Sequence, residues 1–232
     1  MHDSLVLGID LGTSGVRVAV LNEQRDLLYT DSSGYVRGLA NPDDWLKSCI
    51  KLIKAIPREL RSQLMALAVD GTSGTLVACD PDGTPLGQAL PYNIACPEQL
   101  DQLRELVPAG QPAASVSGSL ARALTLLQQH SRPLILRHQA DWISGWLLGD
   151  WRFGEEGNNL RLGWSLSDQR WPCAFERQEW REALPDIRPS GSRLGVMNAA
   201  RAKQLGLSED MLVIAGTTDA NAAVLTADAA DD

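Results

Sequence analysis

The stretch VLGIDLGTSGVRVAV, residues 6–20, decides the fold. Two apolar, β-branched runs flank a Gly-Thr-Ser-Gly turn at 12–15, a pattern that predicts a β-hairpin. Gly12 and Gly15 let the backbone approach a ligand closely, and inward-pointing N–H groups in such a turn form a concavity that binds anions. Asp10 ends the first strand beside this turn. Because Mg²⁺ takes few carboxylates and keeps phosphate and water as its other ligands, the stretch predicts a site for a metal-bound phosphate.

A plainer interpretation of the same stretch stays open. A strand, a glycine-containing turn and a second strand form a common unit, and an aspartate beside a turn is equally common. The stretch is also neither of the two standard phosphate loops, because no Gly-Lys-Ser/Thr follows it and no helix opens directly from it.

Composition narrows the class of protein. The chain has 232 residues, enough for one large or two small domains, and 44% of them are hydrophobic, which fits a globular protein with a full core. The net charge of −8 argues against nucleic acid or an anionic membrane as the main partner. No apolar run reaches the length of a membrane span, and residues 1–30 lack a signal-peptide pattern. The four cysteines and three histidines show no metal-ligand spacing, which indicates a reduced, cytoplasmic protein.

The order of elements predicts an α/β fold with a mixed sheet. After the hairpin and a third strand at 27–30, Asn41 and Pro42 open a helix that ends before Pro57, and an apolar run at 64–69 predicts a buried parallel strand. Further along the chain, strands are expected at 86–92 and 211–215, and helices at 97–107, 117–129, 137–148, 174–184 and 198–205. In the helix at 137–148, Trp142 and Trp146 lie on one face, a spacing typical of core packing, although a platform for sugar rings is the alternative.

Two later stretches repeat the pattern of residues 6–20, an apolar strand that ends in aspartate, glycine and hydroxyl residues. Residues 67–77, LAVDGTSGTLV, again run from an apolar strand through Asp70 and a Gly-Thr-Ser-Gly turn into an apolar strand. The strand at 211–215 leads through Gly-Thr-Thr into a helix whose first turn contains Asp219. Either threonine, Thr217 or Thr218, can cap that helix, and the N-terminus of a helix favours anions. We call the three strand ends the first, second and third tip (residues 10–14, 70–73 and 216–219). Because ligands of open α/β sheets bind at the carboxyl ends of strands, we expect the three tips to gather on one sheet edge. Asp219 either belongs to such a site or only complements the helix dipole.

The order of the three tips resembles the FGGY family of sugar kinases, within the actin-like ATPase superfamily. The residues that carry the resemblance are Gly8-Ile9-Asp10-Leu11-Gly12-Thr13-Ser14, Val69-Asp70-Gly71-Thr72-Ser73-Gly74 and Ala215-Gly216-Thr217-Thr218-Asp219. The segment His138-Gln139-Ala140-Asp141-Trp142, followed later by Asn158-Asn159, resembles the plant and cyanobacterial ribulose/xylulose kinase-like members. The resemblance covers nearly the whole chain and implies a ribonuclease H-like (actin-like ATPase) domain, a mixed sheet flanked by helices.

The resemblance also implies roles. Asp219 would be the catalytic base that takes the proton of a sugar hydroxyl as it attacks the γ-phosphate of ATP. Asp10 would hold Mg²⁺. The residues expected at the phosphates are Gly12, Thr13, Ser14, Gly216 and Thr217, and those expected at the substrate are Asp10, Thr72, Ser73 and Asp219. The co-substrates would be ATP and a small sugar, ribulose or xylulose.

Two departures from the family pattern leave a second hypothesis open. Family members commonly carry a polar Asp-Arg-type element where this chain has Ile94-Ala95-Cys96, which weakens sugar recognition. The chain also stops soon after Asp219, whereas family kinases have a second, C-terminal domain that completes the ATP pocket. We therefore expect residues 1–232 to form a single N-terminal domain, with the C-terminal ATPase domain missing or separate. The alternative is a non-catalytic sugar-binding or scaffold domain, a degenerate relative of the kinases.

Overall fold

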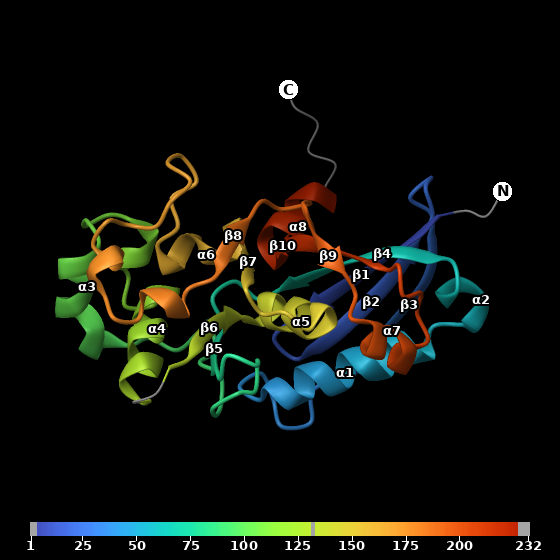
Figure 1. Ribbon diagram of the computed structural model, residues 1–232, viewed down its shortest axis with the longest axis horizontal. Coiled ribbons are helices and arrows are strands. Elements are labelled where there is room, and N and C mark those ends of the chain that lie inside the picture. The colour runs from blue at the N-terminus through green and yellow to red at the C-terminus, as the bar shows by residue number, and fades with distance from the viewer. Residues whose placement is uncertain (1–3, 131–132, 227–232) are drawn as a thin grey trace.

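The computed structural model describes residues 4–130 and 133–226, and a six-stranded mixed sheet lies at its centre (Figure 1). The strands of this sheet are β1 (Leu5–Leu11), β2 (Gly15–Leu21), β3 (Leu27–Gly34), β4 (Leu64–Gly71), β9 (Arg193–Val196) and β10 (Leu212–Thr218). Their spatial order is β3-β2-β1-β4-β10-β9, in which β1, β4 and β10 are parallel and the others run antiparallel to their neighbours. The predicted hairpin and the predicted parallel strand are therefore confirmed.

One face of the sheet carries the main hydrophobic core. In β1, the side chains of Leu5, Leu7 and Ile9 are buried while Val6 and Gly8 are exposed. This alternation has the period of two that a strand requires when only one of its faces is covered.

Helices α1 (Pro42–Ala55), α5 (Gln139–Leu148) and α7 (Ala199–Leu205) contribute the other side of that core. Pro42 occupies the first turn of α1 as predicted, whereas Asn41 stands at the N-cap position without a capping bond from its side chain. Trp45 on α1 is fully buried and meets Trp142 on α5 edge to face, with 6.0 Å between ring centroids. This contact confirms core packing for Trp142.

A second, smaller core lies beside the first (Figure 1). It is built around α3 (Leu100–Leu106) and α4 (Ser119–Gln128). The antiparallel pair of β5 (Leu76–Cys79) and β6 (Ile135–His138) separates the two cores. Alternate residues of this pair face opposite ways, since Leu76 and Ala78 join the small core while Val77 and Cys79 join the large one.

The remaining elements are short. They are the helices α2 (Arg58–Arg61), α6 (Glu156–Asn159) and α8 (Asp219–Thr226), the strands β7 (Phe153–Glu155) and β8 (Asp186–Arg188), and the 3-10 turns η1 (Pro97–Gln99), η2 (Pro112–Ala114), η3 (Leu160–Leu162), η4 (Phe175–Arg177) and η5 (Arg181–Ala183).

Three sequence-based expectations were wrong. Residues 86–92 form no strand and pair only through isolated bridges, because Gly87 and Pro91 interrupt the segment and proline cannot donate to a ladder. The helix expected at 137–148 begins two residues later, since the first two residues extend β6. The helix expected at 174–184 is two 3-10 turns, because Gln178 between them is extended.

Candidate functional site

The three predicted tips meet at one edge of the sheet. The strands β1, β4 and β10 are neighbours and parallel, so their carboxyl ends lie together (Figure 1). Asp10 stands directly opposite Asp70, and Gly71 stands opposite Thr218. Asp219 lies close enough to raise the pKa of both carboxyls by charge repulsion. The predicted gathering of the tips is confirmed.

The first tip is a tight turn held from both sides. The amide of Gly12 donates to the carbonyl of Gly15 at 2.9 Å, so this amide is not available to a ligand. A Cβ on Gly15 would lie 2.4 Å from the carbonyl oxygen of Ser33 on β3, which requires glycine there. Thr13 and Ser14 remain exposed at the end of the turn, where their hydroxyls can reach a ligand.

Asp10 is a partly exposed carboxylate with one cationic neighbour. Its carboxylate lies 3.4 Å from the guanidinium of Arg17, whose side chain is 76% exposed, so this ion pair adds little stability. Burial raises the pKa of Asp10, and Asp219 raises it further, while Arg17 acts in the opposite direction. The site therefore concentrates negative charge without a buried cation to balance it.

Asp70 joins the second tip to the third. Its carboxylate accepts a hydrogen bond of 2.7 Å from the amide of Thr217. Burial raises the pKa of Asp70, and that hydrogen bond lowers it. A Cβ on Gly216 would lie 2.1 Å from the carbonyl oxygen of Val69 and 2.6 Å from the Asp70 carboxylate, so only glycine fits against β4 here. Gly216 and Thr217, predicted at the phosphates, thus brace the tip.

The third tip opens α8, and Thr218 caps it. The hydroxyl of Thr218 accepts from the amide of Asn221 at 3.2 Å, and the Asn221 side-chain amide donates to the hydroxyl of Thr217 at 3.1 Å. Of the two threonines that could cap this helix, Thr218 is the one that does. Asp219 is the first residue of α8 and is exposed, with one carboxylate oxygen on the amide of Ala220.

The second tip places its two predicted sugar contacts differently. Thr72 is buried, and its hydroxyl lies 2.8 Å from that of Thr75 and donates to Gln139 at 2.7 Å. Ser73 is half-buried at the end of the strand. The expectation that both hydroxyls face a sugar is therefore narrowed to Ser73, because that of Thr72 is used inside the protein.

Sequence reasoning missed two residues beside the site. The hydroxyl of Tyr92 lies 3.2 Å from that of Thr13, so this ring reaches across to the first tip. Arg122 is fully buried on α4 and donates to the carbonyl oxygens of Gly74, Tyr92 and Ile94 at 2.8, 3.1 and 2.7 Å. Nothing in the sequence marked either residue, because both contacts join segments far apart in the chain.

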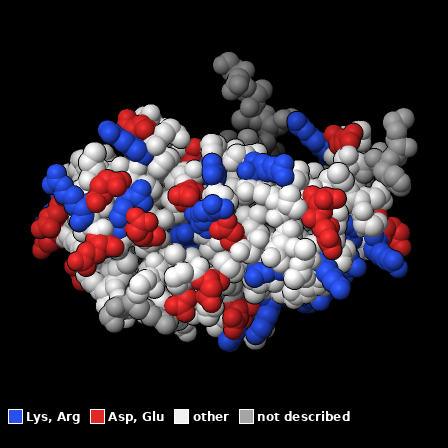
Figure 2. All heavy atoms as spheres, in the orientation of Figure 1, with Lys and Arg blue, Asp and Glu red and all other residues white. Residues whose placement is uncertain are grey.

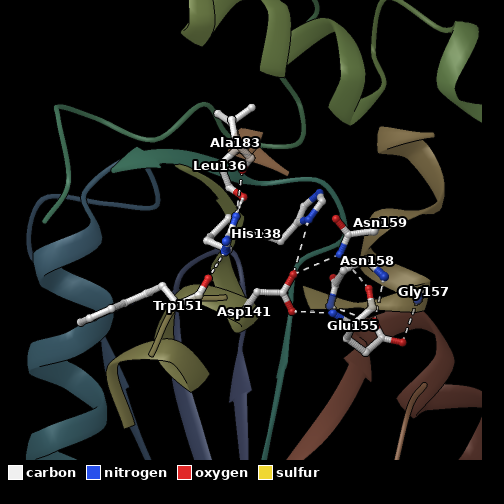
Figure 3. Close-up of polar contacts among 10 residues, drawn as sticks. Leu136, His138, Asp141, Trp151, Glu155, Gly157, Asn158, Asn159 and Ala183 are labelled. Atoms are coloured by element: carbon white, nitrogen blue, oxygen red, sulfur yellow. Dashed lines mark hydrogen bonds and ion pairs between the residues drawn. The ribbon is translucent and has the colours of Figure 1, made fainter. Parts of the chain in front are cut away.

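A buried polar cluster around Asp141 and Glu155 joins α5 to α6 (Figure 3). The carboxylate of Glu155 accepts from the amides of Gly157 and Asn158 at 2.7 and 2.8 Å and from the hydroxyl of Ser190 at 2.5 Å, and it thereby caps α6. Asp141 on α5 accepts from the Glu155 amide at 3.0 Å, which joins α5 to α6.

This cluster reaches the first turn of α8. A Cβ on Gly157 would lie 3.1 Å from the side-chain amide of Asn221, so α6 packs directly against that turn. His138 is fully buried, with its Nδ1 3.7 Å from the Asp141 carboxylate. Through these contacts, α5 and α6 support the helix that carries Asp219.

The carboxylates at the tips fit a magnesium ion that keeps phosphate and water as ligands. Among residues 4–130 and 133–226, no three His, Cys, Asp or Glu side chains come close enough to hold a metal by themselves. The mutual repulsion of Asp10, Asp70 and Asp219 is relieved by a cation, and Mg²⁺ is commonly bound by one or two carboxylates plus substrate phosphates. The donor set at Asp10 therefore suits Mg²⁺ delivered with a nucleotide.

The face of the molecule drawn in Figure 2 shows no broad region of one charge among the described residues. On the face drawn in Figure 2, acidic and basic side chains are interspersed over both cores. No helix within the described part of the chain is long and apolar enough to cross a membrane.

Comparison with known proteins found no matching family model but clear relatives. The chain is 26% identical over 246 residues to a xylulose kinase of Lactococcus lactis, covering 95% of this chain and 48% of that protein. It is 25% identical over 249 residues to a xylulose kinase of Staphylococcus epidermidis, with 94% and 48% covered. The chain thus spans about half the length of the curated relatives it matches.

Solved structures show the same fold. Xylulose kinase from Rhodospirillum rubrum superposes with a TM-score of 0.82 and 18% identity, over 96% of this chain and 51% of that one. Plasmodium falciparum glycerol kinase with ADP gives 0.80 at 13% identity, over 96% and 50%. These likenesses confirm the predicted fold class, while the plant and cyanobacterial subgroup stays a prediction.

Proposed function

We propose that this chain, which is related in sequence and fold to the N-terminal half of the FGGY sugar kinases, is the sugar-binding and catalytic-base half of an ATP-dependent pentulose kinase. One observation carries the proposal: the exposed carboxylate of Asp219 begins α8 at the sheet edge that also holds Asp10 and the 12–15 turn. An exposed base beside a phosphate-sized turn is the arrangement that phosphoryl transfer to an alcohol needs.

In the proposed reaction, Asp219 accepts the proton of a sugar hydroxyl. The hydroxyl oxygen forms a bond to the γ-phosphorus of ATP as the bond from that phosphorus to the bridging oxygen breaks, and ADP leaves. Such a transfer depends mainly on positioning and on charge stabilisation, so one carboxylate base is sufficient.

The first tip takes the phosphate side of the reaction. The exposed hydroxyls of Thr13 and Ser14 donate to the oxygens of the transferring phosphate. Asp10 would hold Mg²⁺, which neutralises charge on the phosphates when it is bound. Gly12 closes the first turn through its bond to Gly15, while Gly216 allows the third tip to pack against β4 and Thr217 braces that tip through Asp70.

The second tip takes the sugar side. Ser73 supplies a neutral donor and acceptor suited to a polyol, and the Tyr92 hydroxyl, 3.2 Å from that of Thr13, joins this side of the site to the first tip. We choose a pentulose, ribulose or xylulose, on the resemblance and on the xylulose kinases among the relatives. Because those relatives are about twice as long as this chain, we propose that a second domain completes the ATP pocket.

Isothermal titration calorimetry of the 232-residue chain tests the substrate class. We expect weak binding of D-ribulose or D-xylulose, since no second domain closes over the sugar. Ser73→Ala should weaken that binding, whereas Ser62→Ala, two residues before the opposite end of β4, should not change it. Tight binding of glycerol with no response to either pentulose would contradict the substrate assignment.

A non-catalytic sugar-binding or scaffold role is the second candidate. Ile94, an apolar residue that is 43% exposed, favours it, because it stands where family kinases carry a polar element. Joining the chain to the C-terminal half of a relative and assaying ADP release distinguishes the two. Sugar-dependent turnover that Asp219→Ala abolishes supports the kinase, and pentulose binding without turnover supports the alternative.

A further inference from the structure

We propose that Gln139 is a positioning residue that holds the phosphate turn at 12–15 and the second tip in a fixed mutual orientation. Gln139 touches neither proposed ligand. The effect on sugar binding and catalysis rests on the proposed function, whereas the connection between the two tips rests on hydrogen bonds alone.

Gln139 is hydrogen-bonded to the second tip. It is the first residue of α5 and is fully buried. Its side-chain carbonyl accepts from the hydroxyl of Thr72 at 2.7 Å and from the backbone amide of Thr72 at 3.3 Å. The backbone amide of Gln139 donates to the carbonyl of Thr75 at 3.1 Å. The side chain of Gln139 thus adds to the backbone bond that the Thr72 amide already makes to the Leu11 carbonyl of β1 at 3.1 Å, and it fixes the Thr72 side chain to α5.

At the other end, Gln139 reaches the first tip through Tyr35. The Gln139 side-chain amide donates to the Tyr35 hydroxyl at 3.1 Å, and the Tyr35 backbone amide donates to the carbonyl of Ser14 at 3.0 Å. Burial raises the pKa of Tyr35, so its hydroxyl stays protonated and remains a neutral partner. One glutamine therefore links two tips that lie on different strands.

The connection closes into a ring. The amide of Tyr92 donates to the hydroxyl of Thr75 at 3.2 Å, which lies 2.8 Å from that of Thr72, the group that Gln139 holds. The Tyr92 hydroxyl returns to Thr13 at 3.2 Å. The link between Gln139 and Tyr35 is the one in this ring that joins α5 to the segment after β3, whose backbone holds Ser14.

Such a link matters for transfer between two bound groups. Thr13 and Ser14 are proposed to contact the phosphate and Ser73 the sugar, so the orientation of the two tips sets the approach of the hydroxyl to the phosphorus. Correct alignment of reacting groups makes a large contribution to the rate. Loss of this link should therefore reduce alignment of the reacting groups and affinity for the sugar while the chain still folds.

Residue-resolved amide hydrogen exchange on the 232-residue chain tests the connection directly. Tyr35→Phe removes only the hydroxyl, and Gln139→Met replaces the amide by a side chain of similar length. We expect Tyr35→Phe to speed exchange at Thr72 and Gln139→Met to speed it at Tyr35, each about fivefold, the size expected for one neutral hydrogen bond. Tyr29→Phe, which removes a hydroxyl from β3, the strand that ends one residue before Tyr35, should change neither.

The same experiment separates positioning from general stability. A purely structural role would speed exchange equally at Ala215, whose amide bonds to Ser192 on the far side of the sheet. Equal acceleration there, or no change at Thr72 in Tyr35→Phe, would overturn the proposal. If Gln139→Met fails to fold, Tyr35→Phe alone decides.

Calorimetry with D-xylulose then tests the functional consequence. We expect each variant to weaken binding about fivefold and the double variant to bind no more weakly than either single one, because both break one link. Unchanged affinity in both variants would overturn the functional part of the proposal. If the unmodified chain binds D-ribulose and not D-xylulose, the comparison is made with D-ribulose. Absence of binding of both pentuloses would instead count against the proposed function, and the exchange data would still decide the connection.

Discussion

Replacing Gly216 by alanine should destabilise the protein strongly, because the third tip is pressed against β4. The added Cβ would lie 2.1 Å from the Val69 carbonyl oxygen and 2.6 Å from the Asp70 carboxylate, and backbone on one side cannot move without its strand. Overpacking of this kind costs roughly 1–3 kcal/mol. Moving the Asp70 carboxylate also weakens its 2.7 Å bond from the Thr217 amide, and a bond to a charged group contributes about 1.5–3 kcal/mol.

These two costs overlap, so we expect a loss of about 3 kcal/mol in the free energy of unfolding. For a chain of this size that corresponds to a fall of roughly 6–12 °C in Tm. Urea denaturation followed by tryptophan fluorescence measures the first quantity and calorimetry the second. Gly87→Ala is the matched control, because a Cβ at Gly87 meets nothing within 4 Å, and it should change stability by less than about 0.5 kcal/mol.

The outcome that refutes this reasoning is a loss in Gly216→Ala no larger than that in Gly87→Ala. The packing between β10 and β4 would then be looser than described. Amide exchange at Thr217 gives an independent check, since this amide should exchange faster only if the Asp70 carboxylate has moved.

Three further predictions follow from other parts of the site. Burial raises the pKa of Asp70 from its usual 3.8, so the stability linked to its protonation is present below that pH and is lost as the pH rises through the raised pKa. Asp70→Asn should flatten this decline in urea titrations that run upward from pH 3.8, and an unchanged slope would contradict it. Arg122→Lys should cost about 3 kcal/mol of unfolding free energy, because a single ammonium cannot replace both the Nε that holds the Gly74 carbonyl and the Nη1 that holds those of Tyr92 and Ile94. The exposed Arg104→Lys serves as a near-neutral control, and equal losses in the two variants would contradict this role of Arg122. With Mg²⁺, ATP and D-ribulose, the 232-residue chain alone should release ADP far more slowly than ~1 s⁻¹, and turnover near that rate that Asp219→Ala abolishes would show that this half suffices.

Local signals made the framework predictable from the sequence. The glycine turn at 12–15 and the alternation along residues 6–20 predicted the hairpin, and Pro42 marked the start of α1. The Gly-Thr-Thr-Asp run located the start of α8. In each case the deciding residues lie within one turn or one strand of the feature they specify. The local preference of the sequence and the tertiary contacts therefore favour the same structure.

Contacts between distant segments were not predictable. The sequence marked Thr72 as a sugar contact because it is a hydroxyl at a strand tip, but Gln139 from a later helix claims that hydroxyl. Arg122 looks like any surface arginine in the sequence until three carbonyls from other segments surround it. The failure at 86–92 has the same origin, since apolar content alone cannot show whether a neighbouring strand is present to pair with.

The position of β10 beside β4 has a consequence for how the chain folds. Asp70 and Thr217, which share one hydrogen bond, are 147 positions apart in sequence. Pairing over such a separation is slow, because a long loop must close before any contact forms. Until β10 arrives, β4 is the outer strand of a four-stranded sheet, and its unpaired backbone N–H and C=O groups are open to pairing with other chains. The strand that completes the site is therefore also the one that closes the sheet against aggregation during synthesis.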